Sequence, residues 1–238
     1  MKGIILAGGL GTRLNPLTLA TNKHLLPVGD KPMVLHPVEK LVSAGIQEIL
    51  LVTGPEHMGA FAALLGSGKN YGCAITYRIQ DEPGGIAQAL RLARSFVGDD
   101  TLCVILGDNM FQDDLADSVA EFEADPQGAM VLLKEVPDPH RFGIAEIEDG
   151  RVISIEEKPA VPKSNYCVTG IYLYDSAVFD IIETVRPSAR GEMEISDVNA
   201  TYLERHALRY RFLDGWWSDA GTFESLRHAN DLVRAAAS

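Results

Sequence analysis

Positive charge, cysteine and long apolar segments are all scarce in this chain of 238 residues. Its 21 lysines and arginines face 33 aspartates and glutamates, which leaves a formal net charge of −12. A surface of that sign repels a polyphosphate backbone, so we expect no nucleic-acid partner. No apolar run approaches the ~18 residues of a membrane span, and Met1-Lys2-Gly3 leads into a strand without a secretory leader. We therefore expect a cytoplasmic protein with no membrane partner.

The three cysteines lie far apart, and neither they nor the histidines show the spacing of a metal site or a catalytic triad. Cys103 and Cys167 fall within apolar runs typical of strands, so we expect them to be buried structural thiols. Internal repeats, low-complexity tracts and linkers are also missing. The simplest organisation is therefore a single domain over residues 1–238.

Two familiar nucleotide-binding motifs are absent as well. The dinucleotide fingerprint would need a third glycine where Leu14 stands, and no Gly-Lys-Ser or Gly-Lys-Thr of a P-loop occurs. What is present is a glycine-rich stretch at 6–14, directly after the apolar run 3–6. Glycines let the backbone approach a ligand and successive N–H groups can bind an anion, while Arg13 and Lys23 add positive charge. The stretch predicts a nucleotide held by its phosphates.

The first half of the chain alternates between strand and helix patterns. Alternation of this kind implies right-handed crossovers and a parallel sheet that is covered on both faces. The predicted strands are Gly3–Ala7, Ile49–Thr53, Ile75–Gln80 and Leu102–Leu106, and the predicted helices are Pro32–Ala44, Glu56–Leu65 and Ile86–Phe96.

The second half changes character, because two strand patterns flank Glu148-Asp149-Gly150, a sequence typical of a hairpin turn. The predicted elements are strands Gly143–Ile147, Val152–Glu156, Val168–Tyr174 and Leu208–Leu213, and helices Ser176–Val185, Glu194–Arg205 and Thr222–Ala236. We expect an α/β fold, with a Rossmann-like, mostly parallel sheet, helices on both of its faces and hairpin additions. The nucleotide-binding half would span about 1–110 and the substrate-binding half about 111–238.

Two aspartates stand where ligands of such sheets bind. Asp108 follows the strand 102–106 through Gly107, and ligands of open α/β sheets lie beyond the carboxyl ends of the strands. Asp219 follows two tryptophans and precedes a glycine turn into the last helix. A carboxylate in either place can ligate Mg²⁺, but it can equally form a turn or cap a helix. The residues alone leave both interpretations open.

The glycine-rich stretch is part of a longer pattern. It reads Gly8-Gly9-x-Gly11-Thr12-Arg13-Leu14-x-Pro16-Leu17-Thr18, then Lys23-x-Leu25-Leu26-Pro27-Val28 and Lys31-Pro32-Met33. This pattern resembles the signature of the sugar-phosphate nucleotidylyltransferases, and the remaining motifs resemble those of the glucose-1-phosphate thymidylyltransferases within that family. The resemblance extends over roughly residues 1–232, with the motifs in the family's order.

The resemblance implies a nucleotide site and a divalent metal. Gln80 and Gly85 would recognise the base, since an amide side chain both donates and accepts hydrogen bonds. Asp108 and Asp219 would hold Mg²⁺, for which two carboxylates suffice. His24 stands where some relatives carry glutamine, and its role stays open. The residues implied to bind the nucleotide are Gly8, Gly9, Gly11, Thr12, Arg13, Lys23, Gln80, Gly85 and Asp108.

The resemblance also implies a sugar-phosphate site around Glu156-Glu157-Lys158-Pro159. Lys158 would hold the phosphate and Glu157 the hexose hydroxyls. The implied set is completed by Asn109, Gly143 and Val168. The segment 191–197 resembles a family motif too, but acidic residues are typical of a first helical turn, so we leave that segment out of the site.

The implied reaction is dTTP plus α-D-glucose 1-phosphate giving dTDP-glucose and pyrophosphate. Because the attacking phosphate is already anionic, no general base is needed, and catalysis rests on alignment and charge stabilisation. Lys158 would position the attacking phosphate, while Arg13 and Lys23 would stabilise the leaving pyrophosphate. The family further implies a homo-oligomer, either a dimer or a tetramer.

Other interpretations stay open. Thymine and uracil present the same hydrogen-bonding edge, so Gln80 does not separate dTTP from UTP, and another hexose 1-phosphate would fit the same chemistry. A non-catalytic nucleotide-sugar sensor is a further alternative, whereas an NAD-dependent dehydrogenase is disfavoured by the missing third glycine. Longer relatives continue into C-terminal helices that bear a regulatory nucleotide site. This sequence stops at Ser238, before those helices, so the resemblance leaves open whether such regulation is present.

Overall fold

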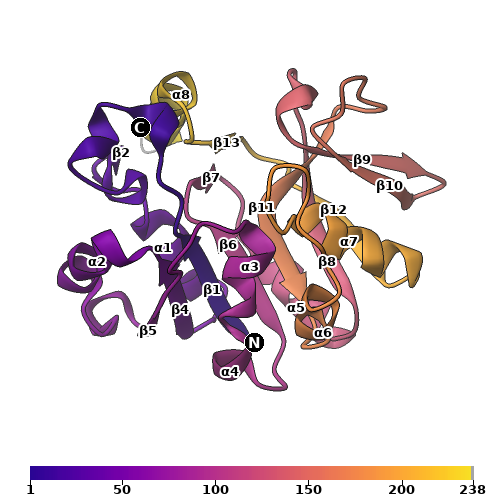
Figure 1. Ribbon diagram of the computed structural model, residues 1–238, viewed down its shortest axis with the longest axis horizontal. Coiled ribbons are helices and arrows are strands. Elements are labelled where there is room, and N and C mark those ends of the chain that lie inside the picture. Colours follow the sequence, from indigo (N-terminus) through magenta and orange to yellow (C-terminus); the bar gives the residue numbers. More distant parts are fainter. Residues whose placement is uncertain (237–238) are drawn as a thin grey trace. The chain divides into compact units, whose positions relative to one another are not determined.

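The computed structural model of the protein describes residues 1–236, which form two compact units (Figure 1). The glycine-loop unit contains Lys2–Pro83, Ile105–Asp117 and the chain from Gly215 onward. The hairpin unit contains Gly84–Val104 and Ser118–Asp214, together with Met1. Each unit thus draws on distant parts of the sequence. The predicted single domain, with a nucleotide-binding half before about residue 110 and a substrate-binding half after it, stays a prediction.

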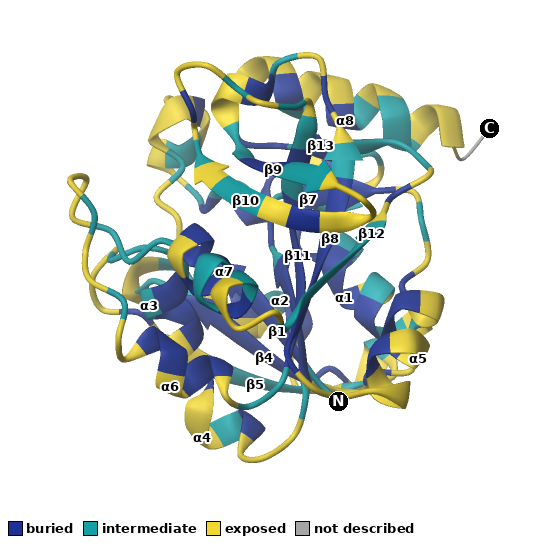
Figure 2. Ribbon diagram, turned by 90° about the vertical axis from the view of Figure 1, so that its right-hand side faces the viewer, coloured by how far each residue is buried: buried dark blue, intermediate teal, exposed yellow. Residues whose placement is uncertain are grey.

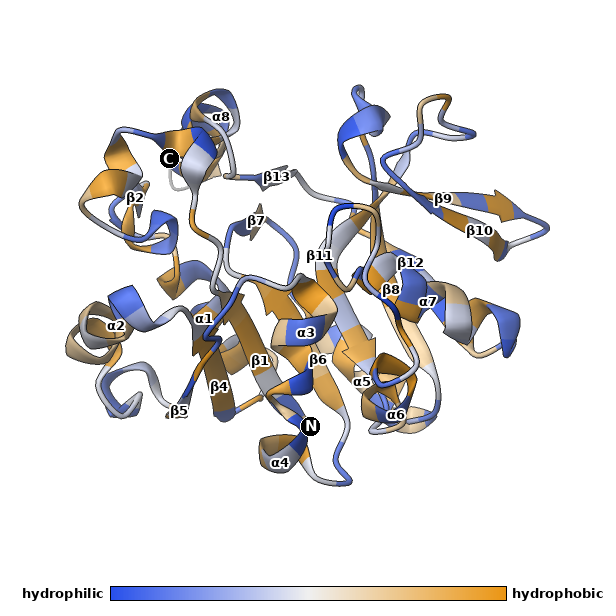
Figure 3. Ribbon diagram, viewed as in Figure 1, coloured by the Kyte–Doolittle hydropathy of each residue, from blue (hydrophilic) through white to orange (hydrophobic). Residues whose placement is uncertain are grey.

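The glycine-loop unit is built on parallel strands. β1 (Lys2–Ala7) pairs with β4 (Glu48–Thr53), and β4 pairs with β5 (Ala74–Ile79), both in parallel. Almost every residue of β1 and β4 is buried, and Figures 2 and 3 show these strands as buried and apolar. Strands covered on both faces are apolar throughout rather than alternating, which is why their positions were predicted within one residue.

The chain passes from one unit to the other inside β6 (Leu102–Leu106). In the glycine-loop unit β6 lies beside β1, so the strand order is β6-β1-β4-β5. After β6 the short strand β7 (Asn109–Phe111) pairs antiparallel with β13 (Trp217–Asp219). Neither of these three-residue strands was predicted, because pairing with a distant segment creates them.

Three helices pack in the glycine-loop unit. α1 (Leu35–Ser43) contacts β1, and α2 (Met58–Leu65) contacts β5. The predicted helix from Pro32 was wrong at its start, because 31–32 form β3 (Lys31–Pro32), which pairs with β2 (Pro27–Val28). The last helix, α8 (Phe223–Ala236), lies beside β2, as Figure 1 shows.

The hairpin unit has a mostly antiparallel arrangement. The predicted hairpin is present as β9 (Gly143–Glu148) and β10 (Arg151–Glu157). β9 lies beside β11 (Tyr166–Tyr174), which also neighbours β6 and pairs antiparallel with β8 (Ala129–Glu135). β12 (Leu208–Phe212) pairs with β8 in parallel. β8 is the one long strand that the sequence patterns missed.

Helices of the hairpin unit differ from prediction in two places. The expected helix Ile86–Phe96 is broken into α3 (Ile86–Arg91) and α4 (Arg94–Val97). α5 (Ala116–Ala124) was not predicted. The remaining two, α6 (Val178–Ile182) and α7 (Ile195–Glu204), fall within their predicted ranges. Cys103 and Cys167 are buried, as expected of structural thiols.

Candidate functional site

The glycine-rich loop of the first unit begins where β1 ends. Gly11 has a φ of 66°, a left-handed conformation that favours glycine, and it starts a 3-10 turn over Thr12–Leu14. Leu14 is fully buried beneath the turn, and its N–H donates to the Gly11 carbonyl at 2.8 Å. This anchoring leaves Thr12 and Arg13 exposed on the outer side of the loop.

Two predicted nucleotide residues lie against this loop. A Cβ added to Gly8 would stand 2.5 Å from Gln80 Oε1, and one added to Gly9 would stand 3.5 Å from Lys23 Cε. A side chain at Gly8 would therefore displace Gln80. The structure brings Gln80 and Lys23 to the loop from distant positions in the sequence.

Lys23 forms an ion pair with Asp108, and both side chains are largely buried. Burial alone would raise the pKa of Asp108, but the Lys23 ammonium and hydrogen bonds from Lys23 and Asn109 hold it well below its usual range. Asp108 is therefore an ionised carboxylate. Lys23 is itself placed by a 3-10 turn that Asn22 caps.

The second predicted metal ligand lies close by in the same unit. Asp219 is the register partner of Asn109 in the β7–β13 pair, and the N–H of Ala220 donates to the Asp108 carbonyl at 2.8 Å. A Cβ added to Gly221 would stand 3.1 Å from Asp219 Oδ2 and 3.0 Å from Arg13 Nη2. The structure thus gathers both aspartates with Arg13 and Lys23 at one end of the unit.

Trp217 is a contributor that the sequence patterns did not single out. Its Nε1–H donates to Asn109 Oδ1 at 2.8 Å, and Asn109 is 3% exposed. Asn109 belongs to the glycine-loop unit, and its side-chain amide also donates a hydrogen bond to Asp108. Its assignment to the sugar phosphate stays a prediction.

His24 is buried next to these residues. Its Nδ1 lies 2.7 Å from Asn22 Oδ1, and its ring packs where a Cβ of Gly107 would stand, 2.7 Å from His24 Cδ2. Burial, with the Lys23 ammonium as a second cause, lowers the pKa of His24 to about 3. The imidazole is therefore neutral near pH ~7 and is a weak base.

In the hairpin unit, four predicted sugar-phosphate residues lie together. Lys158, at the end of β10, pairs with Glu157 at 3.1 Å. A Cβ added to Gly143 would stand 3.2 Å from Glu157 Oε2 and 4.0 Å from the Cβ of Val168. The register of β9 with β10 explains this, since Gly143 is opposite Glu157.

Two further residues join this group: Ser196, from the segment that we left out, and Arg190, which directly precedes that segment. Ser196 Oγ donates to Glu157 Oε2 at 2.6 Å. Arg190 Nη2 lies 3.6 Å from Glu157 Oε1 and 2.9 Å from Glu194 Oε1. Glu194 precedes the first turn of α7, as expected for an acidic residue there, and it also pairs with Arg190 beside Glu157. The motif's resemblance was a signal that pointed to Ser196, whereas Arg190 lies outside the motif.

Comparison with known proteins shows the family to which the chain belongs. The family model described as nucleotidyl transferase matches residues 2–236. The chain belongs to the nucleotidyl transferase family. The enzyme class and α/β fold predicted from the sequence are thereby confirmed.

Several relatives of this nucleotidyl transferase are named more narrowly. A glucose-1-phosphate thymidylyltransferase of Neisseria meningitidis is 46% identical, over 98% of this chain and 83% of its own length. One of Mycolicibacterium smegmatis is 46% identical, over 98% and 82%. A crystal structure from Bacillus anthracis, provisionally assigned to the same activity and complexed with sucrose, has 57% identity and a TM-score of 0.95, covering 98% of this chain and 95% of its own.

A UDP-glucose pyrophosphorylase complexed with UDP-glucose has a TM-score of 0.87 at 24% identity, covering 99% of this chain and 98% of its own, and it shows the shared fold alone. Within the part of the chain that the structure describes, no helix is both long and apolar enough to cross a membrane.

Members of this family generally use a divalent metal. Within residues 1–236, no three His, Cys, Asp or Glu side chains form a group that could hold a metal on their own. The two aspartates of this transferase nonetheless fit a hard cation, which takes few carboxylates and completes its shell with water and phosphate oxygens. Asp108 is ionised, as a ligand must be, but Lys23 would have to release it.

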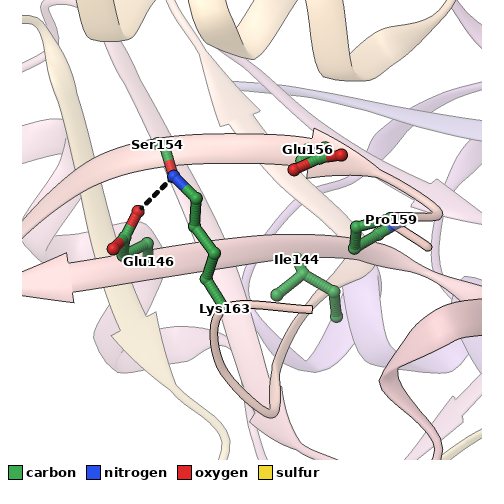
Figure 4. Close-up of a pocket in the computed structure, with 6 residues that line it drawn as sticks. All are labelled: Ile144, Glu146, Ser154, Glu156, Pro159 and Lys163. Atoms are coloured by element: carbon green, nitrogen blue, oxygen red, sulfur yellow. Dashed lines mark hydrogen bonds and ion pairs between the residues drawn. The ribbon is translucent and has the colours of Figure 1, made fainter. Parts of the chain in front are cut away.

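The hairpin unit also has a pocket beside the β9–β10 hairpin, on the face that carries Glu146 and Ser154 (Figure 4). Lys163 Nζ and Glu146 Oε2 form an ion pair across it at 2.9 Å, and Ser154 donates to the same carboxylate at 2.8 Å. None of the predicted site residues lines this pocket. We therefore keep the candidate sites at the glycine-rich loop and around Glu157.

Proposed function

We propose that this nucleotidyl transferase transfers a thymidylyl group from dTTP to α-D-glucose 1-phosphate, giving dTDP-glucose and pyrophosphate. The observation that carries the proposal is the gathering of Arg13 and Lys23 with Asp108 and Asp219 beside a glycine-rich loop. Such a group suits a nucleotide triphosphate with its metal. The choice of dTTP and glucose 1-phosphate is supported by the names of relatives that are 46% identical over nearly the whole chain.

Arg13, Lys23 and the loop amides of Gly8, Gly9, Gly11 and Thr12 would bind the nucleotide phosphates. Gln80 and Gly85 would recognise the base. Mg²⁺, held by Asp108 and Asp219, would offset negative charge on the phosphates when bound. Arg13 and Lys23 lie in a protein of net charge −12. Binding of the nucleotide phosphates therefore depends on this local positive charge rather than on the field of the whole protein.

Lys158 and Arg190 would bind the phosphate of the sugar. Glu157 would accept hydrogen bonds from hexose hydroxyls, assisted by the backbone at Gly143 and Val168. The pairs that Glu157 makes with Lys158 and Arg190 are at 3.1 and 3.6 Å, so all three charges are already held at one place. Asn109 would provide an amide contact to the same substrate.

The chemistry needs alignment more than proton transfer. An oxygen of the sugar phosphate attacks the α-phosphorus, the bond from that phosphorus to the β-phosphate oxygen breaks, and pyrophosphate leaves opposite. The nucleophile is already an anion, which agrees with a buried, neutral His24 that has a pKa of about 3. Holding the reactants in line supplies on the order of 7–11 kcal/mol. Arg13 and Lys23 offset the charge that develops on pyrophosphate.

The test is pyrophosphate release with Mg²⁺, with dTTP or UTP paired with the 1-phosphates of glucose, glucosamine, galactose and mannose. We expect fastest release with dTTP and glucose 1-phosphate. Faster release with UTP or another sugar would correct the substrates and keep the chemistry, whereas nucleotide binding without release from any pair would favour a sensor. Assembly as a homo-dimer or homo-tetramer and a cytoplasmic location stay predictions, which light scattering and cell fractionation can check.

A further inference from the structure

The turn that carries Gly85 is bonded directly to the loop that carries Arg190, and both belong to the hairpin unit. The N–H of Met193 donates to the Gly84 carbonyl at 2.8 Å, and the N–H of Ala87 donates to the Met193 carbonyl at 3.1 Å. Both main-chain hydrogen-bonding groups of Met193 are thus used on this turn. The two segments lie about a hundred residues apart in the sequence.

Gly85 is in addition packed against the main chain of Met193. Its φ is 97°, and a Cβ added there would stand 2.5 Å from the Met193 carbonyl oxygen and 2.8 Å from the Met193 nitrogen. Real Cβ atoms do not approach other atoms this closely, and the atoms in the way are backbone. Any side chain at Gly85 must therefore displace Met193.

The loop that leads into Met193 and Glu194 is held together by its own hydrogen bonds. Glu194 binds Arg190 through both carboxylate oxygens at 2.9 Å and accepts from Ser188 Oγ at 2.7 Å. The N–H of Ser188 donates to the Glu192 carbonyl at 2.9 Å. Glu194 directly follows Met193 in the chain and is hydrogen-bonded to Arg190. A displacement of Met193 therefore moves Glu194 and with it Arg190.

The same displacement reaches Glu157. Glu194 immediately precedes α7, whose residue Ser196 donates to Glu157 Oε2 at 2.6 Å. Arg190 approaches the other oxygen of Glu157 at 3.6 Å. Glu157 therefore takes its orientation partly from the loop that Met193 fixes.

We propose that Met193 is a positioning residue for sugar-phosphate binding, and that Gly85 is required because it leaves room for the Met193 main chain. Gly85 then contributes to binding of the sugar phosphate as well as to recognition of the base. Sugar-phosphate affinity depends on Gly85 even when no nucleotide is present. The inference rests on the proposed function, since it takes Arg190, Glu157 and Lys158 to bind that substrate.

Two neighbouring glycines provide a matched test. Gly85→Ala places a methyl group against the Met193 backbone, whereas Gly84→Ala meets only the amide end of the flexible Gln88 side chain, at 2.5 Å. Binding of glucose 1-phosphate is measured by calorimetry, without nucleotide. We expect Gly85→Ala to weaken binding roughly tenfold or more, since small misplacements at such sites have effects of this size. Gly84→Ala should bind within about twofold of the unchanged protein.

A second variant covers the case in which Gly85→Ala fails to fold, as judged by circular dichroism. Ser188→Ala removes the hydroxyl bonded to Glu194 and lies outside the base turn, so it should raise KM for glucose 1-phosphate several-fold and leave KM for dTTP unchanged. Equal glucose 1-phosphate affinity in folded Gly85→Ala and the unchanged protein would overturn the inference, as would an unchanged KM in Ser188→Ala. If the unchanged protein binds dTTP but no glucose 1-phosphate, the proposed substrate is wrong instead.

Discussion

At the scale of single residues, the Lys23–Asp108 pair links the phosphate loop to the metal candidates. Both side chains are largely buried, at 13% and 15% exposed, so the aspartate depends on the lysine for its charge. The positions are separated by 85 residues, and the motifs predict a role for each without indicating that the two side chains meet. The pairing explains why Asp108 is ionised although it is withdrawn from water.

The pH dependence of stability follows from this pair. Because the folded pKa of Asp108 lies below its unfolded value, its contribution is fully present above the unfolded value of about 3.9 and is lost as the pH falls through the folded value. Asp108→Asn should therefore lose less stability than the unchanged protein as the pH is lowered from about 5 to about 3. Thermal unfolding at each pH checks this, with the exposed Asp231→Asn as control. Parallel curves for Asp108→Asn and the unchanged protein would contradict it.

His24 packs in the same region as a neutral, uncharged ring. Because its pKa is about 3, His24 does not titrate near neutral pH. Its titration should therefore cause no fall in the reaction rate as the pH is lowered through that range. We expect His24→Gln to lower kcat at every pH between about 6 and about 9 and to leave the shape of the profile unchanged. Disappearance of a limb near pH ~6.5 in the variant would show that the imidazole acts as a base.

At the scale of elements, long apolar runs were predictable and short pairings were not. The continuous apolar runs of β1, β4 and β6 predict strands by themselves, since both faces of such strands are covered. β8 is equally apolar, but a short apolar run does not distinguish a buried strand from a helix. The break between α3 and α4 comes at Leu92–Ala93, where neither glycine nor proline marks it.

The candidate site shows the same limit. Residues next to strand ends, such as Asp108 and Lys158, could be proposed for the site because a strand end has a sequence pattern and the family resemblance gives these positions a role. Arg190 was missed, since its place depends on a loop that is bonded through Met193 to the turn at Gly84. A contact made across about a hundred residues leaves no periodic signal in the chain.

The docking of α8 gives a stability prediction. Asn230 Oδ1 accepts from the Gly29 N–H at 2.9 Å, which ties the helix to the turn between β2 and β3. Asn230→Ala removes this acceptor and should lower the free energy of unfolding by about 1 kcal/mol, or roughly 2–4 °C in Tm. The neighbouring exposed residue gives the control, since Asp231→Ala should leave Tm within about a degree. A drop in Tm shared by both variants would argue against the hydrogen bond as its cause.

At the scale of the whole molecule, we propose that each unit binds the phosphate groups of one substrate. Arg13 belongs to the glycine-loop unit and Lys158 to the hairpin unit, so their loss should affect different parameters. Lys158→Ala should chiefly raise KM for glucose 1-phosphate. Arg13→Ala should lower kcat by about a hundredfold or more with both substrates saturating, since a lost charge-stabilising donor has effects of this order. Steady-state kinetics separate the two, and near-normal turnover in Arg13→Ala would remove it from the leaving-group role.

The most direct test of the central claim is a single experiment on the unchanged protein. Purified chain is mixed with Mg²⁺, dTTP and glucose 1-phosphate, and the phosphorus-containing products are followed by ³¹P NMR. We expect dTDP-glucose and pyrophosphate to form in equal amounts. Binding of both substrates with no pyrophosphate formed, or pyrophosphate without dTDP-glucose, would contradict it.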